Sequence, residues 1–464
     1  MEGFDKATRR KIFYSFALLF FVVVPLVILY ARGYVLDLGR RRIVATGGIF
    51  VKTVGTGARV FVDDEFARET SFISRGALIT SLLPKRYTVL VEQEGHRSWR
   101  KVVRVANEEV LEFRNVFLPP ATITPTVVFN TRQRGPSRLV ALPGTPEIAV
   151  ESGAGAASKA VFFVNPETRV SRTNIIRISE WLWDGRTNVA LILRESDGRR
   201  QWFSLPYEPD GSAKETRIAF QGLPKEFSAE FVTPHPVHAG EFYFFAGGAL
   251  FLQGRASVPM PIAEQVHAYA VGSDRLYFVS QNGFFVESDL DGRETKVLGR
   301  KGLFLDPEAP AQIYVAASGD VFVLDAAGGL FHYQPGRDQE LGLVAGNVTG
   351  LDAASAGDRI LFWDDHRLWI YWLRDNPAQP FDLARSKKQI FYSGEPIRQA
   401  FLNSEGTHAF FSDGARIRMT EVDDRGSTNV YDLVAEPHDS FLLDREALTL
   451  FWTKGPQVFR ANLK

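Results

Sequence analysis

The pattern of hydrophobic and polar positions divides the chain into one long apolar run and many short alternating segments. The run Ile12–Ala31 contains no charged residue, and it follows a basic segment with Lys6, Arg9, Arg10 and Lys11. Because an α-helix rises about 1.5 Å per residue, a run of this length matches the roughly 30 Å hydrocarbon core of a bilayer. The pattern therefore predicts a transmembrane helix over residues 12–31.

The same run is predicted to be an uncleaved signal anchor. A cleaved signal peptide has an apolar region of roughly 7–15 residues, followed by a small-x-small cleavage site. Here the run is longer, and it continues into Arg32-Gly33-Tyr34-Val35, which has no such site. The remaining alternative is a buried helix of a soluble protein, which would not need apolar residues on every side.

Basic residues flank this run on both sides and bear on its orientation. The four that precede it favour a cytoplasmic N-terminus, whereas Arg32 and Arg40–Arg42 favour the reverse. The first short flank usually dominates, and long domains translocate largely regardless of their charge. We therefore predict that residues 1–11 are cytoplasmic, that residues 32–45 form a short basic linker, and that the large C-terminal body is extracytoplasmic.

From residue 46 the pattern changes to alternation with a period of two, which is typical of β-strands with one buried face. Val60 and Val62 share one face of a first strand, and a turn at Pro84 precedes a second alternating strand that ends at Val91. Two further alternating strands follow. Residues 46–120 are therefore predicted to form a small β domain.

Three motifs occur in order within this small domain and carry a family resemblance. They read G-A-x-V-x-V-D, L-x-P-x-x-Y-x-V-x-V and G-x-x-x-W, and their residues are Gly57, Ala58, Val60, Val62, Asp63, Leu82, Pro84, Tyr87, Val89, Val91, Gly95 and Trp99. In this order they resemble a PEGA domain. The sequence departs from the PEGA pattern where Gly55-Thr56 stands in place of Pro-Glu and where Lys85 replaces the usual turn glycine.

The resemblance to a PEGA domain implies a small prealbumin-like β sandwich. It also implies an interaction or spacer role on the bacterial cell envelope. The order of apolar helix, PEGA-like domain and long β region also resembles a group of single-pass bacterial membrane proteins, and this second resemblance implies no particular activity.

Short aromatic hairpins recur from residue 126 to residue 464. In one of them, Arg275–Val279 and Phe284–Val286 flank the turn Gln281-Asn282-Gly283. The hairpins recur at intervals of roughly 33–52 residues, which is the range expected of propeller blades. Because an isolated hairpin cannot cover both of its faces, radial repetition is one way to pack such units. We therefore predict a β-propeller of seven or eight blades, with tandem β sandwiches as the alternative.

Composition and charge narrow the function classes. Lys plus Arg and Asp plus Glu each number 54, so the chain has no net charge to drive binding of nucleic acid. The absence of cysteine excludes disulfides, thiol nucleophiles and cysteine-ligated metal sites. It is compatible with an exported protein. We predict no cofactor.

Two groups of residues are candidates for a binding or catalytic site. Asp364, Asp365 and His366 form the densest polar cluster, which suits an acid/base or metal site but equally suits the turn of a hairpin. Trp181 and Trp183 could stack against a sugar, or they could pack in a core. The motifs of nucleotide-binding loops, α/β-hydrolases and zinc proteases do not occur.

These observations predict a membrane-anchored extracytoplasmic binding or scaffold protein of the cell envelope, with an envelope protein or a cell-wall glycan as its partner and the bilayer contacted through residues 12–31. The alternative is an envelope glycan hydrolase or lyase with its site in the propeller channel. Two carboxyl groups facing each other at roughly 5–9.5 Å would favour the enzyme. A sensor or assembly factor would need a folded cytoplasmic part, which residues 1–11 are too few to form.

Overall fold

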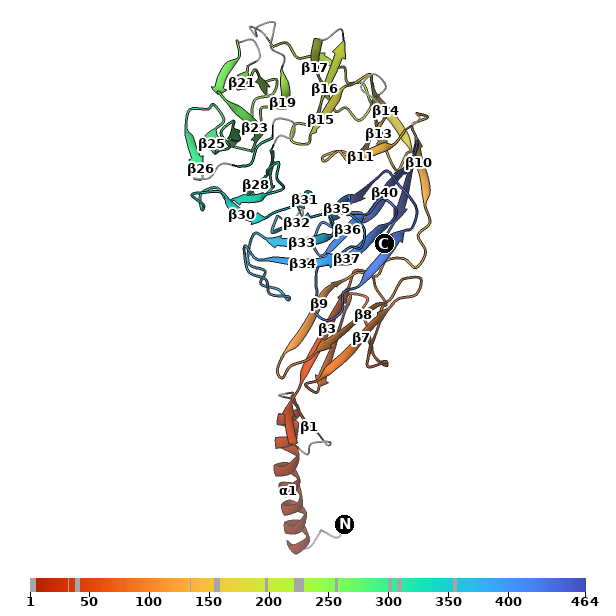
Figure 1. Cartoon of the computed structure of the whole chain (residues 1–464). Coiled ribbons are helices and arrows are strands. Elements are labelled where there is room, and N and C mark those ends of the chain that lie inside the picture. The colour runs from red at the N-terminus through yellow and green to blue at the C-terminus, as the bar shows by residue number, and fades with distance from the viewer. Residues whose placement is uncertain are drawn as a thin grey trace.

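The computed structural model describes residues 6–31, 33–37, 42–133, 135–153, 159–196, 199–220, 229–254, 258–298, 303–306, 311–353 and 357–464. In chain order, Figure 1 shows a single helix, a short hairpin, a small two-sheet domain and a large ring of sheets. The helix and the ring lie at opposite ends of the molecule. The protein is therefore mainly β, as the alternating pattern predicts.

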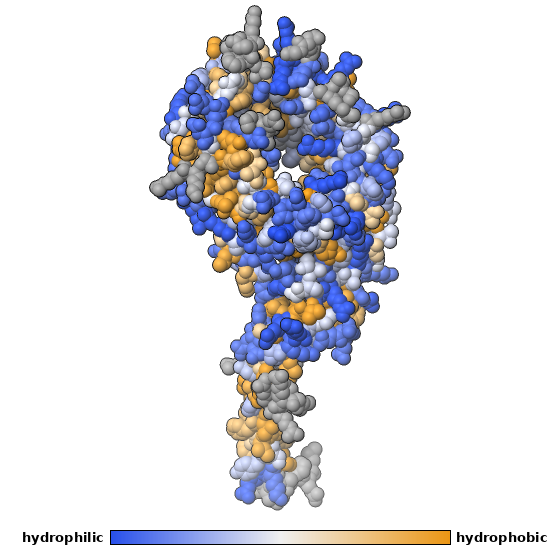
Figure 2. All heavy atoms as spheres, in the orientation of Figure 1, coloured by the Kyte–Doolittle hydropathy of each residue, from blue (hydrophilic) through white to orange (hydrophobic). Residues whose placement is uncertain are grey.

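The helix α1 spans Lys6–Ala31. Its stretch Arg10–Leu29 is long and apolar enough to cross a membrane, and it could act as a signal anchor or as a signal sequence. Figure 2 shows this helix as a mostly apolar projection, with polar residues near its end. It leads into an antiparallel hairpin of β1 (Tyr34–Asp37) and β2 (Arg42–Ala45).

The small domain is a β sandwich of two sheets, in the orders β6-β3-β9 and β5-β4-β7-β8. Only β3 and β9 pair in parallel among the described strands of these sheets. The strands are β3 (Gly47–Thr53), β4 (Arg59–Val62), β5 (Glu65–Glu69), β6 (Gly76–Leu82), β7 (Arg86–Glu92), β8 (Trp99–Arg104) and β9 (Val110–Val116).

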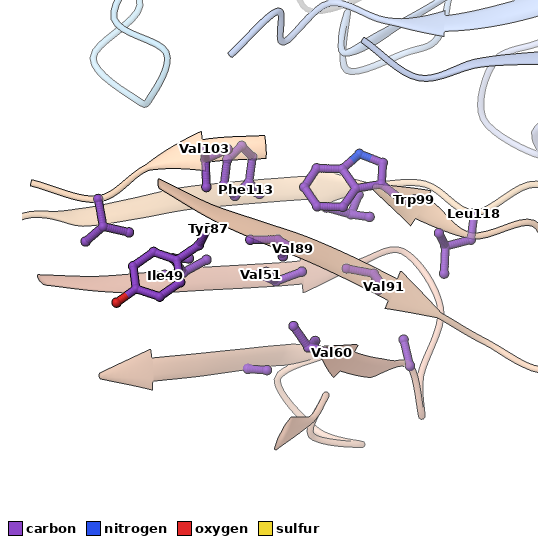
Figure 3. Packing of buried hydrophobic residues seen from close by; sticks show 14 residues of the cluster. Ile49, Val51, Val60, Tyr87, Val89, Val91, Trp99, Val103, Phe113 and Leu118 are labelled. Carbon is purple, nitrogen blue, oxygen red and sulfur yellow. The ribbon is translucent and has the colours of Figure 1, made fainter. Parts of the chain in front are cut away.

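Alternation places one side of each sandwich strand in a shared core. Along β7 the side chains of Tyr87, Val89 and Val91 are buried, while their neighbours are at least partly exposed. Figure 3 shows these side chains packed between the strands of the two sheets, with Trp99 at one end of the core. Hydrophobic burial of this face accounts for the register, because a shift by one residue would turn the apolar set outward.

The ring is a β-propeller with eight four-stranded antiparallel sheets in the described part of residues 126–464. Blades 1 to 4 are β11 (Ser137–Ala141), β12 (Ile148–Ser152), β13 (Ala160–Asn165) and β14 (Val170–Ile176); β15 (Glu180–Asp184), β16 (Val189–Ser196), β17 (Arg199–Pro206) and β18 (Thr216–Arg217); β19 (Glu230–Pro234), β20 (Phe242–Ala246), β21 (Ala249–Gln253) and β22 (Met260–Ala263); and β23 (Val266–Val271), β24 (Arg275–Ser280), β25 (Phe285–Asp289) and β26 (Thr295–Leu298).

Blades 5 to 8 complete the ring. Their strands are β27 (Gln312–Val315), β28 (Val321–Leu324), β29 (Leu330–Tyr333) and β30 (Gly342–Ala345); β31 (Gly350–Ala353), β32 (Arg359–Trp363), β33 (Arg367–Trp372) and β34 (Lys387–Tyr392); β35 (Gln399–Leu402), β36 (His408–Ser412), β37 (Ile417–Glu421) and β38 (Val430–Val434); and β39 (Ser440–Asp444), β40 (Thr449–Lys454), β41 (Gln457–Asn462) and β10 (Thr126–Asn130).

Blade 8 closes the ring by combining strands from both ends of this region. Its outer strand β10 pairs antiparallel with β41, with Thr126 opposite Arg460. A hydrophobic cluster between blades 8 and 1 joins Val128 and Phe451 to Leu139 and Val150. Seven further clusters each lie between two consecutive blades. The alternative of tandem β sandwiches is therefore wrong for this part of the chain, because every blade is covered on both faces by its neighbours.

The connections of the blades emerge on two opposite faces of the ring. Because the strands of each blade are antiparallel, loops from first to second and from third to fourth strands lie on one face, which we call the junction face. Loops from second to third strands and from blade to blade lie on the other, which we call the distal face. The sandwich contacts blades 6 and 7 through loops of the junction face.

Candidate functional site

The sequence-predicted cluster Asp364-Asp365-His366 lies on the distal face, in the turn between β32 and β33. Oδ1 of Asp364 accepts hydrogen bonds from the backbone N–H groups of His366 (2.9 Å) and Arg367 (2.8 Å). This carboxylate therefore closes the turn, as short acidic side chains commonly do. Asp365, next to it, is exposed.

This turn also lines an open pocket between blades 5 and 6. The pocket walls include Asn347, Thr349, Arg367 and Tyr392, together with the backbone around Ala327. Such a set offers an aromatic surface, an amide, a hydroxyl and charges of both signs. It suits binding of a polar ligand or of polar protein side chains.

The aromatic part of this distal-face pocket has a defined arrangement. The rings of His366 and Tyr392 stack with centroids 6.1 Å apart. Nδ1 of His366 lies 3.2 Å from the carbonyl oxygen of Ser393, which fixes the imidazole against the loop to blade 7. Tyr392 is 60% exposed. No group of three or more metal-ligating side chains occurs in the part of the chain that the structure describes.

The second sequence-predicted pair, Trp181 and Trp183, lies on the first strand of blade 2. Both indoles belong to the cluster between blades 1 and 2, where their centroids lie 6.1 and 5.8 Å from that of Phe163. Nε1 of Trp181 donates to Glu151 Oε2 (2.8 Å), and Nε1 of Trp183 donates to the carbonyl oxygen of Pro143 (3.3 Å). These contacts are those of interblade packing, and neither indole lines the distal-face pocket.

A buried ion pair joins the sandwich to the propeller. Lys101 on β8 is fully buried, and its Nζ lies 3.1 Å from Oε1 of Glu421 in blade 7. The same ammonium donates to the carbonyl oxygens of Asp423 (2.5 Å) and Arg425 (3.0 Å). Oε2 of Glu421 accepts a hydrogen bond from Nε1 of Trp99 (3.0 Å). Each buried charge therefore has partners from the other domain.

A second set of contacts ties blade 6 to the edge of the sandwich. The Gln379 side chain donates to the carbonyl oxygen of Val110 (2.9 Å) and accepts from the backbone N–H of Glu112 (3.0 Å). The Arg425 guanidinium of blade 7 donates to the carbonyl oxygen of Glu112 (2.6 Å). Phe117, beyond the sandwich, packs in the cluster between blades 7 and 8. The junction is thus both polar and apolar.

Sequence reasoning missed Lys101 and Glu421, although one local pattern pointed to the lysine. Lys101 lies on the same buried face of β8 as Trp99 and Val103. A lysine in such a position is almost never fully buried unless it is paired. The alternation therefore predicts a buried ion pair without identifying the distant acid.

Sequence reasoning also missed an ion pair near the inner strands of the ring. Nη2 of Arg445, between β39 and β40, lies 2.5 Å from Oδ1 of Asp352 on β31. Oδ2 of Asp352 accepts from the backbone N–H of Leu402 on β35 (2.8 Å). This carboxylate links blades 6, 7 and 8, and its oxygens are occupied by structural partners.

His408 lies at the junction and is neutral near physiological pH. Burial, reinforced by the positive charge of Lys101, lowers the pKa of His408 from 6.5 to about 4. Thr407 Oγ1 lies 3.0 Å from Nδ1 of the imidazole, and the rings of Phe117 and His408 form a T-shaped pair with centroids 5.7 Å apart.

The lowered pKa of His408 makes the junction sensitive to acid. In the unfolded chain this histidine binds a proton near pH 6.5, whereas in the folded chain it does so only near pH 4. The free energy of unfolding is therefore highest above pH 6.5 and decreases as the pH falls from 6.5 toward 4. The loss should reach about 3 kcal/mol. We expect His408→Gln to remove this part of the pH dependence in urea unfolding measured from pH 8 to pH 4. An unchanged slope in the variant would contradict the assignment.

Comparisons with known proteins identify no family for this chain. No protein-family model matches the chain, and no curated protein matches it in sequence. Solved structures similar to it include the β-propeller domain of Cps50 (Swd1) from Myceliophteria thermophila (12% identity, TM-score 0.40, covering 74% of this chain and 100% of that one). A second is Sqt1 of Saccharomyces cerevisiae (10% identity, TM-score 0.48, covering 73% of this chain and 99% of that one). A third is Hsv2 of Kluyveromyces lactis (11% identity, TM-score 0.40, covering 64% of this chain and 98% of that one). The propeller assignment rests on the strand pairing and the eight interblade clusters.

Proposed function

We propose that the chain is a membrane-anchored extracytoplasmic scaffold of the bacterial cell envelope, whose propeller binds an envelope protein or a cell-wall glycan. Residues 12–31 act as the anchor, with residues 1–11 in the cytoplasm and residues 32–45 as a linker. Residues 46–120 act as a PEGA-like spacer, and residues 126–464 present the binding surface. The apolar character of α1 and the two-sheet architecture of the small domain support this division.

The junction between sandwich and propeller is the observation that carries the proposal. A spacer on a flexible linker would present every face of the ring equally. Here the buried pair Lys101–Glu421 and the Gln379 contacts hold one face of the ring against the sandwich. The distal face is consequently held in a fixed orientation, turned away from the sandwich.

The pocket between blades 5 and 6 is the binding surface we propose on that face. It combines the exposed Tyr392 ring with Asp365, Arg367 and the Asn347 amide. Aromatic and arginine side chains in such settings commonly dominate the energy of protein interfaces. The same groups also suit sugar hydroxyls, so the two partner classes share this site.

Single cysteines test location and binding surface together, because the native chain contains none. Ala327→Cys places a thiol at the distal-face pocket, and Ala67→Cys places one on exposed strand β5 of the sandwich. In intact spheroplasts, a membrane-impermeant maleimide should label both variants but not Glu2→Cys. A maleimide–diazirine reagent should then cross-link an envelope protein or glycan from position 327 and not from position 67.

Maleimide labelling tests the orientation in the membrane, and cross-linking tests the binding surface, so each can contradict its own part of the proposal. Labelling of Glu2→Cys together with protection of both body positions would overturn the proposed orientation. Labelling of both body positions with equal or absent cross-linking at position 327 would instead overturn the distal face as the binding surface.

A further inference from the structure

The distal-face pocket between blades 5 and 6 is lined by polar side chains that the fold itself does not use. Its volume is about 560 Å³, within the range of roughly 300–1,000 Å³ that is typical of small-molecule sites. Among the residues that the structure describes, neither the Asp365 carboxylate nor the Asn347 amide has a hydrogen-bond or ion-pair partner, and both side chains are exposed. Asp364 differs, because the turn already uses its Oδ1. Asp365 and Asn347 are therefore available to a ligand.

The imidazole of His366 adds a further acceptor to the pocket. Its Nδ1 lies 3.2 Å from the carbonyl oxygen of Ser393, and because a carbonyl oxygen only accepts, this nitrogen carries the proton. In the neutral imidazole the other nitrogen, Nε2, is then an acceptor, and it has no partner among the described residues. Acceptors on Asp365 and His366 thus occur beside donors on Asn347 and Arg367.

Tyr392 supplies an aromatic surface that a ligand can reach. It lines the pocket and is 60% exposed, unlike the indoles of Trp181 and Trp183, which pack between blades. Its ring stacks with the imidazole of His366, which helps to hold it in place. The faces of an aromatic ring carry partial negative charge and attract the polarised C–H groups of a sugar ring. The pocket therefore offers an apolar platform together with hydrogen-bonding groups.

The mixture of donors and acceptors distinguishes between the two partner classes that the proposed function leaves open. A hydroxyl group both donates and accepts, so the hydroxyls of one sugar can satisfy donors and acceptors together. A charged side chain of a partner protein would pair with Asp365 or with Arg367, but not with both. We infer that this pocket binds a pyranose unit of a cell-wall glycan, with a C–H face of the sugar on Tyr392 and its hydroxyls bonded to Asp365 and Asn347. The inference rests on the proposed function and narrows its partner to a glycan.

The charges of the pocket favour an uncharged glycan. The carboxylates of Asp364 and Asp365 are accompanied by one guanidinium, of Arg367, whose Nη1 lies 4.0 Å from Oδ2 of Asp364. The lining therefore has one negative charge in excess, which would repel the carboxylates of acidic sugars. Because the pocket is open, a glycan chain can continue beyond the bound unit. The ligand is consequently a segment of a neutral glycan and not a free monosaccharide.

The test uses the full-length chain in detergent micelles, with the tetramers of glucose and of N-acetylglucosamine as probes. Binding is followed by saturation-transfer NMR and by calorimetry. Tyr392→Ala removes the aromatic platform, and we expect it to weaken binding at least about tenfold. The matched control is Phe381→Ala, at an aromatic residue that is 71% exposed in the loop between β33 and β34 on the junction face. We expect this control to bind as the native chain does.

Asp365→Ala provides a second variant at an exposed position, and we expect it also to weaken binding at least about tenfold. The tetramer of galacturonic acid, which has a carboxylate on every unit, should bind less tightly than the two neutral tetramers. Absence of binding by both neutral tetramers at millimolar concentration would overturn the inference, as would equal binding by the Tyr392 and Phe381 variants. Equal binding of the acidic tetramer would overturn the preference for a neutral glycan, and equal binding of the monosaccharides would overturn the assignment to a glycan segment.

Cross-linking from position 327 separates failure of this inference from failure of the proposed function, because Ala327 lines the same pocket. A glycan product from Ala327→Cys would support both. A protein product alone would overturn the glycan assignment and leave the distal face as the binding surface. The absence of any product would overturn that surface as well.

Discussion

Val128→Asp is expected to lower the free energy of unfolding of the propeller by about 4 kcal/mol. Val128 on β10 is 4% exposed and packs in the cluster that joins blade 8 to blade 1. Burial of a carboxyl group raises its pKa by up to 3–5 units, and each unit corresponds to about 1.36 kcal/mol. The new carboxyl group would lie where the ring closes, so the cost of burying it falls on the contact between blades 8 and 1.

The neighbouring residue supplies the control for this prediction. Val127 is on the same strand but is 41% exposed, so Val127→Asp should change stability by no more than about 1 kcal/mol. Urea unfolding of both variants, followed by tryptophan fluorescence in the same detergent, gives the comparison. Equal stability of the two variants would show that β10 does not close the ring in solution.

Lys101→Met is expected to lower stability by about 3–5 kcal/mol. The substitution keeps the length of the side chain but leaves the Glu421 carboxylate, which is only 8% exposed, without its cation. Removal of one member of a buried pair is costly because the remaining charge stays desolvated. Two carbonyl oxygens, of Asp423 and Arg425, also lose their donor.

The matched control for Lys101→Met is Lys85→Met, in the same domain. Lys85 pairs with Asp63 on the surface, and the two side chains are 55% and 41% exposed. Exposed pairs of this kind contribute only about 0–1 kcal/mol. Limited proteolysis should release the sandwich from the propeller in the Lys101 variant and not in the Lys85 variant. A single unchanged unfolding transition for both would mean that the ion pair does not join the domains.

The second and third strands of most blades could be predicted from sequence because both of their faces are buried. The segments Arg275–Val279 and Phe284–Val286 correspond to β24 and β25 of blade 4. The first and outer strands are less regular, as β18 with its two residues illustrates. The closure of blade 8 could not be predicted from the sequence around β10, because this segment forms a strand by pairing with β41 at the far end of the chain.

The candidate sites likewise divide into one that local sequence predicts and one that it does not. The turn character of Asp364-Asp365-His366 is local, because an acidic residue that accepts backbone N–H groups two and three positions later depends only on nearby sequence. The junction is not local. Trp99 and Glu421 are 322 residues apart, and Trp372 lines one cavity with Trp99 and Phe113 only because the two domains adjoin. Periodicity shows which side of a strand is buried, but not which distant surface buries it.

Closure by strands from both ends of the propeller has a consequence for synthesis. Thr453 of blade 8 donates to the carbonyl oxygen of Ser137 in blade 1, across 316 residues of chain. At a synthesis rate of roughly 5–20 residues per second, blade 1 waits about 15–60 s for this partner. During that interval the apolar side of blade 1 and the edge of β10 are uncovered, so a nascent chain would depend on a chaperone at the site of emergence. Any chain that ends before β40 would keep that surface permanently, which makes it a natural target for quality-control proteases.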